Sequence, residues 1–161
     1  MKTDTSLPPS DPVLRSDATA TRRPQHAIYK PNSRGTGGVV RFELNGYKEA
    51  VFVDAAPQSG DRQFDWEAKL TMKWGLSDLG AALSVFQGRQ PAAKLFHRSE
   101  KSNSACEIVA RDDADRSPFL FSLSRQEEDK SVRKIAIPVT HAEAAILEVV
   151  LGRAVETLAG W

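Results

Sequence analysis

The residue types that most often carry out chemistry are few in this chain of 161 residues, and they stand far apart. His26, His97 and His141 have no cysteine, aspartate or second histidine at the spacing of a metal site. Cys106 is the single cysteine, which excludes an internal disulfide and a cysteine-based zinc site. Ser99 lacks the Gly-x-Ser-x-Gly context of a nucleophile. We therefore predict no enzyme, and no catalytic residue, metal, cofactor or small-molecule substrate.

Basic residues beside aromatic residues form a second pattern. They are Tyr29 with Lys30, Arg41 with Phe42, Tyr47 with Lys48, Arg62 near Phe64 and Trp66, Lys73 with Trp74, and Phe96 between Lys94 and Arg98. On open sheets, rings stack on unpaired bases at about 1–3 kcal/mol each, and cations follow the phosphates. Neighbours along a strand face opposite ways, so some of these rings belong to the core. The pattern indicates single-strand binding, with an ordinary sheet as the alternative.

The stretch from Gln63 to Leu83 must position several of these residues. From Gln63 to Trp74, apolar and polar residues alternate, which predicts one long strand. Apolar residues from Leu79 to Phe86 then recur at helical spacing, which predicts a short amphipathic helix with Ser77 as its N-cap.

Turn signals separate the other strands. The Asn45-Gly46 pair predicts a hairpin, and residues 57–61 predict a loop. The expected strands cover residues 27–30, 39–44, 48–55, 63–74, 94–98, 105–111, 119–124 and 133–139. Thr140 and Glu143 form a capping box that predicts the start of a second helix. The order is four strands and a helix, present twice, in an α+β fold.

The last helix is apolar on more than one side. In a small domain, such a helix usually needs burial against a partner subunit. We therefore predict an oligomer, and the alternative is a helix clamped between two sheets of one subunit. The predicted interface residues are Ile146, Leu147, Val150, Leu151, Ala154 and Leu158.

Composition sets further limits. The formal charge is +1, so any nucleic-acid surface must come from local clustering of charge. Residues 1–25 are rich in Pro, Ser, Thr and Asp, which predicts a disordered tail before a domain of residues 26–161. The tail lacks the apolar segment of a signal peptide, and its aspartates disfavour a transit peptide. No apolar run reaches the roughly 20 residues that span a bilayer. These features predict a cytoplasmic protein outside the membrane.

Several runs in the chain carry a resemblance to a known family. They are Phe52, Ala55-Ala56-Pro57 and Arg62-Gln63-Phe64-Asp65-Trp66, then Leu95-Phe96-His97, Phe121-Ser122-Leu123-Ser124, Ile137-Pro138-Val139-Thr140 with Ala142-Glu143, and Gly160-Trp161. In this order they resemble the Whirly family of single-stranded-DNA-binding proteins. The resemblance covers about residues 27–161. It implies two four-stranded antiparallel sheets packed crosswise, each followed by a helix, in a homotetramer joined through its helices.

One departure concerns the family's Lys-Gly-Lys-Ala-Ala-Leu strand. Its best counterpart here is Arg34 to Val39, with Thr36 at the second lysine, whereas an alternative alignment uses Lys30. In the family, that lysine is linked to DNA binding and higher assembly. Plant members go to organelles, and this chain lacks a convincing transit peptide, so the simpler interpretation is a bacterial-type relative in the cytoplasm.

We therefore predict a homotetramer that binds single-stranded DNA, largely without sequence preference, in replication, repair or transcription. The predicted phosphate contacts are Lys30, Arg34, Arg41, Lys69, Lys73, Lys94 and Arg98. The predicted stacking rings are Tyr29, Phe52, Trp66 and Phe96, of which Trp66 equally fits the core. One alternative is an RNA-binding protein, like the guide-RNA-binding proteins that share this architecture. Another is an interaction scaffold that has lost nucleic-acid binding, which the near-neutral charge and Thr36 favour.

Overall fold

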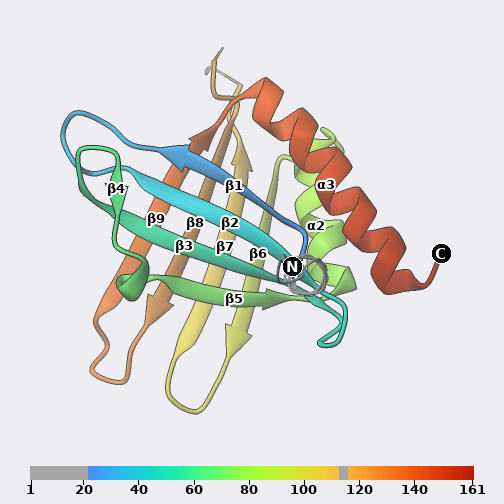
Figure 1. The fold of residues 1–161 in the computed structure, drawn as a ribbon, viewed down its shortest axis with the longest axis horizontal. Coiled ribbons are helices and arrows are strands. Elements are labelled where there is room, and N and C mark those ends of the chain that lie inside the picture. The colour runs from blue at the N-terminus through green and yellow to red at the C-terminus, as the bar shows by residue number, and fades with distance from the viewer. Residues whose placement is uncertain (1–21, 113–115) are drawn as a thin grey trace, which may run out of the picture.

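Two antiparallel sheets cross one another, and a helix follows each of them (Figure 1). The structure, a computed structural model, describes residues 22–112 and 116–161. The first sheet contains β1 (Gln25–Lys30), β2 (Gly38–Asn45), β3 (Ala50–Gly60), β4 (Gln63–Phe64) and β5 (Leu70–Trp74), and the helix α2 (Leu76–Phe86) follows it. The second sheet contains β6 (Ala92–Arg98), β7 (Asn103–Ala110), β8 (Phe119–Gln126) and β9 (Val132–Val139), and the helix α3 (His141–Ala159) follows it. The predicted α+β architecture is confirmed, with a fifth strand in the first sheet.

Most strands lie where alternation predicted them, but β3 is longer than expected. It continues through Pro57 to Gly60, where a loop was predicted. Pro57 has no N–H to leave unpaired, and its carbonyl accepts a hydrogen bond from the backbone N–H of Asp65 at 2.9 Å. The end of β3 therefore pairs with the two residues of β4 instead of leaving the sheet.

The predicted single strand from Gln63 to Trp74 is wrong. A 3-10 helix, η1 (Trp66–Ala68), separates β4 from β5. Before this turn, Phe64 lies against Tyr29 of β1, whereas after it Leu70 and Trp74 are buried in the core. The turn therefore moves residues of one alternating series onto two different faces of the sheet.

Aromatic rings from both sheets meet at the centre of the core. Phe42 of β2, Trp74 of β5 and Phe121 of β8 have ring centroids 5.8–6.1 Å apart in tilted or edge-to-face arrangements. Such pairs add about 0.5–1.5 kcal/mol each to the burial of the rings. These contacts hold the inner faces of the two sheets together, so each sheet keeps one outer face turned away from the other.

The two helices begin in different ways. Thr140 caps α3, since its Oγ1 accepts from the backbone N–H of Glu143 while Glu143 accepts from the backbone N–H of Thr140, and this confirms the predicted capping box. The N-cap of α2 is Gly75, so the prediction of Ser77 is wrong. The Asp78 carboxylate accepts from the Gly75 N–H at 3.0 Å, which fixes the start of the helix two residues earlier.

The stripe of α3 that faces the core corrects part of the predicted oligomer interface. Leu147, Leu151 and Ala154 are buried within this chain, so their side chains are not available to a second copy. Ile146 is exposed and Val149 is 73% exposed on the other side of the helix. Val150 and Leu158 are half-buried. The helix packs against α2, not between two sheets.

The connection between β1 and β2 is held by the amide of Gln58. Its Oε1 accepts from the backbone N–H groups of Asn32 and Gly37 at 2.9 Å each. Its Nε2 donates to the carbonyl oxygens of Asn32 and Gly60. The segment that carries Arg34 and Thr36 is therefore an ordered turn.

We expect Gly37→Ala to destabilise the protein by about 3 kcal/mol, because a Cβ at Gly37 would overlap the carbonyl oxygen of Lys30. Urea denaturation measures this change. Gly46→Ala is the matched control, since among the described residues no atom lies within 4 Å of a Cβ at that exposed turn position, and we expect a change within about 0.5 kcal/mol. Equal effects of the two substitutions would contradict the close approach at Gly37.

Candidate nucleic-acid interface

The outer face of the first sheet collects several of the predicted contacts. Ile28, Val40, Phe42 and Val53 are buried and mark the inner face of the sheet. Their neighbours along each strand therefore point to the outer face. The residues that share this outer face include Tyr29, Arg41, Glu43, Phe52, Asp54, Thr71 and Lys73. Arg41, Asp54 and Thr71 lie directly opposite one another on β2, β3 and β5. The sheet therefore places rings and cations from four strands on one face.

The segment from β4 to η1 returns over this face and adds two more rings. Phe64 packs against the exposed ring of Tyr29, with centroids 5.7 Å apart. Trp66 lies over the guanidinium group of Arg41, whose Cζ is 4.4 Å from the ring centroid. Trp66 is half-buried, so it belongs neither to the core nor to open solvent. Sequence alternation missed this return because it assigned Trp66 to the inner face.

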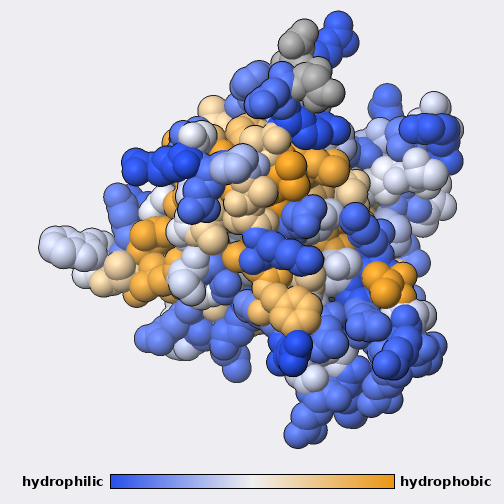
Figure 2. All heavy atoms as spheres, turned by 180° about the vertical axis from the view of Figure 1, so that it is seen from behind, coloured by the Kyte–Doolittle hydropathy of each residue, from blue (hydrophilic) through white to orange (hydrophobic). Residues whose placement is uncertain are grey.

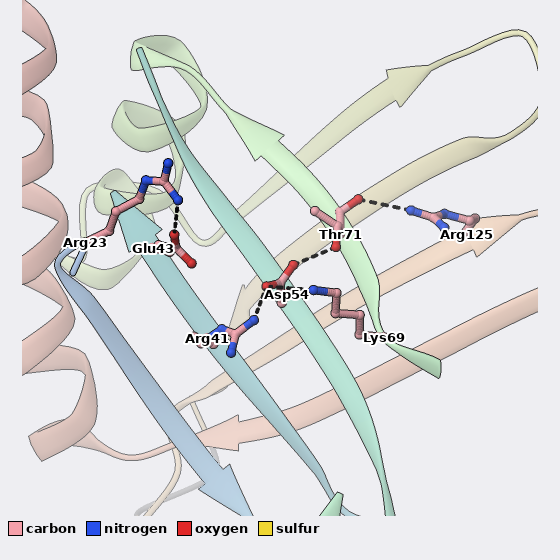
Figure 3. Close-up of polar contacts among 7 residues, drawn as sticks. All are labelled: Arg23, Arg41, Glu43, Asp54, Lys69, Thr71 and Arg125. Carbon is pink, nitrogen blue, oxygen red and sulfur yellow. Dashed lines mark hydrogen bonds and ion pairs between the residues drawn. The ribbon is translucent and has the colours of Figure 1, made fainter. Parts of the chain in front are cut away.

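A buried carboxylate, Asp54, joins the cations of this face (Figure 3). Its Oδ2 lies 2.6 Å from Nη2 of Arg41 and 3.7 Å from Nζ of Lys69. Its Oδ1 accepts a hydrogen bond from the hydroxyl of Thr71 at 2.6 Å. The sequence did not predict a role for Asp54, because its place opposite Arg41 depends on the observed length of the turn between β2 and β3.

Lys30 lies apart from this face. Its Nζ is 2.7 Å from Oε1 of Glu143, at the start of α3. Burial alone would raise the pKa of Glu143, but hydrogen bonds from Lys30 and Thr140 hold that pKa below its usual range. Lys30 therefore fastens α3 to β1, and this role competes with the predicted phosphate contact. Arg34 is exposed in the turn between β1 and β2.

The remaining predicted residues lie on the second sheet. Lys94, Phe96 and Arg98 are exposed on the outer face of the edge strand β6, and Cζ of Arg98 lies 5.3 Å from the centroid of the Phe96 ring. Figure 2 shows this side of the molecule, where hydrophobic side chains gather over part of the sheet between hydrophilic ones. The sheets pack through their inner faces, so the two groups of predicted contacts lie on opposite sides of one subunit.

Other reactive groups form no second site in the part of the chain that the structure describes. No three histidine, cysteine, aspartate or glutamate side chains gather there as a metal site would require. His97 pairs with Asp78, with Nε2 and Oδ2 3.2 Å apart. Within residues 22–112 and 116–161, no helix is long and apolar enough to cross a bilayer.

Burial raises the pKa of the Cys106 thiol well above its ordinary value of 9.0, and the carboxylates of Asp78 and Glu107 add to this. Above pH 9 the unfolded chain loses the thiol proton while the native state keeps it. The free energy of unfolding should therefore fall as pH rises, by up to about 1.4 kcal/mol per pH unit from this group. Urea denaturation between pH 9 and 10.5 measures the slope. Cys106→Ala should lower the slope by this amount, and parallel curves for both proteins would contradict the assignment.

The chain matches the family model described as Whirly transcription factor over residues 22–150. Among curated proteins, "Single-stranded DNA-binding protein WHY1, chloroplastic" of Solanum tuberosum is 26% identical over 155 residues, covering 92% of this chain and 54% of the relative. "Single-stranded DNA-binding protein WHY2, mitochondrial" of Arabidopsis thaliana is 28% identical over 130 residues, covering 77% of this chain and 52% of the relative. This chain therefore spans about half the length of these relatives.

Solved structures share the fold. The crystal structure of WHY1 from Arabidopsis thaliana superposes with a TM-score of 0.69 at 22% identity, covering 87% of this chain and 93% of that chain. The plant transcriptional regulator PBF-2 gives 0.70 at 23% identity, with 88% and 85% covered. MRP1/MRP2 of Trypanosoma brucei gives 0.67 at 16% identity, with 92% and 94% covered.

These comparisons correct the predicted location. The four curated relatives that match are named as chloroplastic or mitochondrial, so the prediction of a cytoplasmic protein is wrong. The composition of residues 1–25, on which that prediction rested, does not determine the location. The structure does not describe residues 1–21, so the predicted disordered tail falls outside it except for residues 22–25. In this short part, Arg23 pairs with Glu43 at 3.5 Å and Gln25 already belongs to β1.

Proposed function

Since this chain belongs to the Whirly family, we propose that it binds single-stranded DNA largely without sequence preference. In this role it protects or regulates exposed strands in replication, repair or transcription, without catalysis. The observation that carries the proposal is the outer face of the first sheet, which combines the rings of Tyr29 and Trp66 with the exposed Lys69 and Lys73. Every base has a face that can stack on such rings, and lysines that follow the backbone are indifferent to sequence. The curated relatives are named for the same ligand.

Fluorescence anisotropy with a labelled 30-nucleotide DNA tests this proposal. We expect the single strand to bind far more tightly than its duplex, and a scrambled sequence to bind about as well as the original. Affinity should fall steeply with salt, because each phosphate contact on a single strand contributes about 0.7 to the slope of log affinity against log salt. Equal binding of duplex and single strand, or binding that salt leaves unchanged, would contradict the proposal.

RNA is the second candidate ligand. One solved structure with this fold is described as a guide-RNA-binding protein complex bound to a guide RNA, with a TM-score of 0.63. At 15% identity this likeness concerns the fold alone. Stacking on rings does not distinguish ribose from deoxyribose unless a protein group reads the 2′-hydroxyl. Competition of the labelled DNA by unlabelled RNA of the same sequence separates the two candidates.

We also propose that the chain acts as a homotetramer. The two groups of predicted contacts lie on opposite sides of one subunit, so a continuous path for a strand needs more than one copy. Ile146 and Val149 leave an apolar surface on α3. Beside it, a groove between α3 and the first sheet is lined by Leu44, Val51 and Val150. We assign this surface to a second copy of the chain.

Ile146→Glu combined with Val149→Glu should reduce the solution mass to that of one chain, because two carboxylates would be buried in an apolar contact. Multi-angle light scattering measures the mass. Val132→Glu is the matched control, since Val132 is an exposed valine on β9, outside α3. An unchanged mass for the double variant would contradict the interface.

A further inference from the structure

Asp54 is a carboxylate at the centre of a face that we propose meets a polyanion. If the face served only to collect positive charge, a buried anion there would oppose that purpose. We propose that Asp54 is a positioning residue, which holds Arg41 beneath Trp66 as the support of a stacking ring and withdraws Arg41 from phosphate contact. This inference rests on the proposed function and deepens it.

The first step is the pairing of Arg41 with Asp54. The two residues lie directly opposite on β2 and β3, and Nη2 of Arg41 is 2.6 Å from Oδ2 of Asp54. Asp54 is 4% exposed, and the side chain of Arg41 is 27% exposed. Burial leaves this pair poorly screened by salt, so a phosphate cannot easily compete for the guanidinium group. Nε of Arg41 is also buried, with no hydrogen-bond partner among the described residues.

The second step is the ring above the guanidinium. Trp66 is the aromatic side chain that binds a cation best, and Cζ of Arg41 lies 4.4 Å from its centroid. The 3-10 helix that carries Trp66 has no side-chain cap and no buried residue of its own. One backbone hydrogen bond, from the N–H of Asp65 to the carbonyl oxygen of Pro57, ties the start of this turn to β3. The other contacts that hold it are Arg41 under Trp66 and Arg133 of the second sheet, which donates to the carbonyl oxygen of Ala68. The ion pair with Asp54 therefore fixes the orientation of the ring.

The third step separates the two cations near Asp54. Nζ of Lys69 lies 3.7 Å from Oδ2, and its side chain is 42% exposed, so Lys69 can leave the carboxylate and reach a phosphate. Thr71 occupies the other oxygen of Asp54 and holds the carboxylate toward Arg41. Lys69 and Lys73 remain phosphate contacts of this face, whereas Arg41 becomes part of the stacking platform.

Salt titrations distinguish these roles. We would measure anisotropy of the labelled 30-nucleotide DNA from low to moderate salt for the unchanged chain and for Arg41→Gln, Arg41→Lys, Asp54→Asn and Lys73→Gln. Lys73→Gln is the matched phosphate-contact control and should lower the salt slope by about 0.7. Arg41→Gln should weaken binding about tenfold with the slope unchanged, which is the loss expected when one base loses its stack. Asp54→Asn should also weaken binding, although it removes a negative charge.

A second measurement reports on the ring itself. In a Trp161→Phe background the remaining tryptophans are Trp66 and the fully buried Trp74, so quenching by DNA reports on Trp66. At saturating DNA, Arg41→Gln should lose most of the quenching, and Arg41→Lys should recover part of it. Thermal melting identifies any variant that has not folded. If Arg41→Gln is unfolded, the milder Arg41→Lys replaces it in both measurements.

A fall of about 0.7 in the slope for Arg41→Gln would make Arg41 a phosphate contact and overturn the inference. Tighter binding by Asp54→Asn would do the same, since simple charge removal would then explain its effect. In both cases the proposed function survives. If the unchanged chain fails to bind single-stranded DNA at any salt, the proposed function itself is overturned together with the inference.

Discussion

Replacing Tyr29 and Trp66 together with alanine is expected to weaken binding of single-stranded DNA by about a hundredfold or more. Each ring that stacks on a base contributes about 1–3 kcal/mol, and the two lie on one face of the first sheet. The loss should be similar for poly-dT and for mixed sequences, because stacking does not read base edges. Anisotropy titrations with both oligonucleotides at one salt concentration measure it.

Tyr47→Ala is the matched control for this double variant. The ring of Tyr47 is 96% exposed at the turn between β2 and β3, away from Trp66, and its removal should leave the affinity unchanged. The variants should melt near the temperature of the unchanged protein, since neither ring lies in the main core. A loss of less than threefold, or a new preference for one base, would show that these rings do not form the platform.

Local signals in the sequence predicted most of the fold. The capping box of Thr140 and Glu143 depends only on residues three apart, so it could be identified without tertiary information. Strand alternation likewise follows from one buried face in each sheet. Helix α3 carries apolar residues on two sides. The sequence therefore could not show which of these sides packs on its own subunit. Leu147 and Val149 look equally suited to an interface until packing buries one and exposes the other.

The break at η1 explains why the candidate site was only partly predictable. Phe64, Trp66, Leu70 and Trp74 keep one parity along the chain, and parity assigns them all to one face. In the 3-10 helix, successive residues rotate by about a third of a turn instead of alternating between two faces. Even-numbered residues therefore point to the outer face before η1 and to the core after it. Trp66 therefore reaches Arg41 on the outer face, whereas Trp74 enters the core. No residue in this run is a glycine or proline that would have marked the change.

The Asp54 network was hidden for a related reason. Asn45-Gly46 correctly predicted a hairpin, but a two-residue turn at that point would place Arg41 opposite Ala50. The observed turn spans four residues, with Glu49 in the left-handed region, and it pairs Asn45 with Ala50 and Arg41 with Asp54. A difference of two residues in turn length thus determines whether the guanidinium group of Arg41 lies opposite the carboxylate of Asp54. Register, more than composition, determines the chemistry of this face.

Phe121→Ala is expected to lower the free energy of unfolding by about 3–5 kcal/mol, the largest effect on stability that we predict. The ring of Phe121 is buried on β8 and contacts both Phe42 and Trp74, so its removal leaves a cavity where the two sheets meet. Neighbours on two separate sheets cannot close that cavity without shifting one sheet against the other. Urea denaturation measures the change, which could leave too little stability for the variant to accumulate.

Phe96→Ala provides the comparison that separates folding from binding. Phe96 belongs to the second sheet, like Phe121, but its ring is exposed on the outer face of β6. The guanidinium group of Arg98 lies over this ring. Its removal should change stability by no more than about 0.5 kcal/mol. If a DNA strand passes over the second sheet as well as the first, the same substitution should weaken binding by about tenfold. Destabilisation by Phe96→Ala comparable to that of Phe121→Ala would contradict the assignment of inner and outer faces on which both proposed contact groups depend.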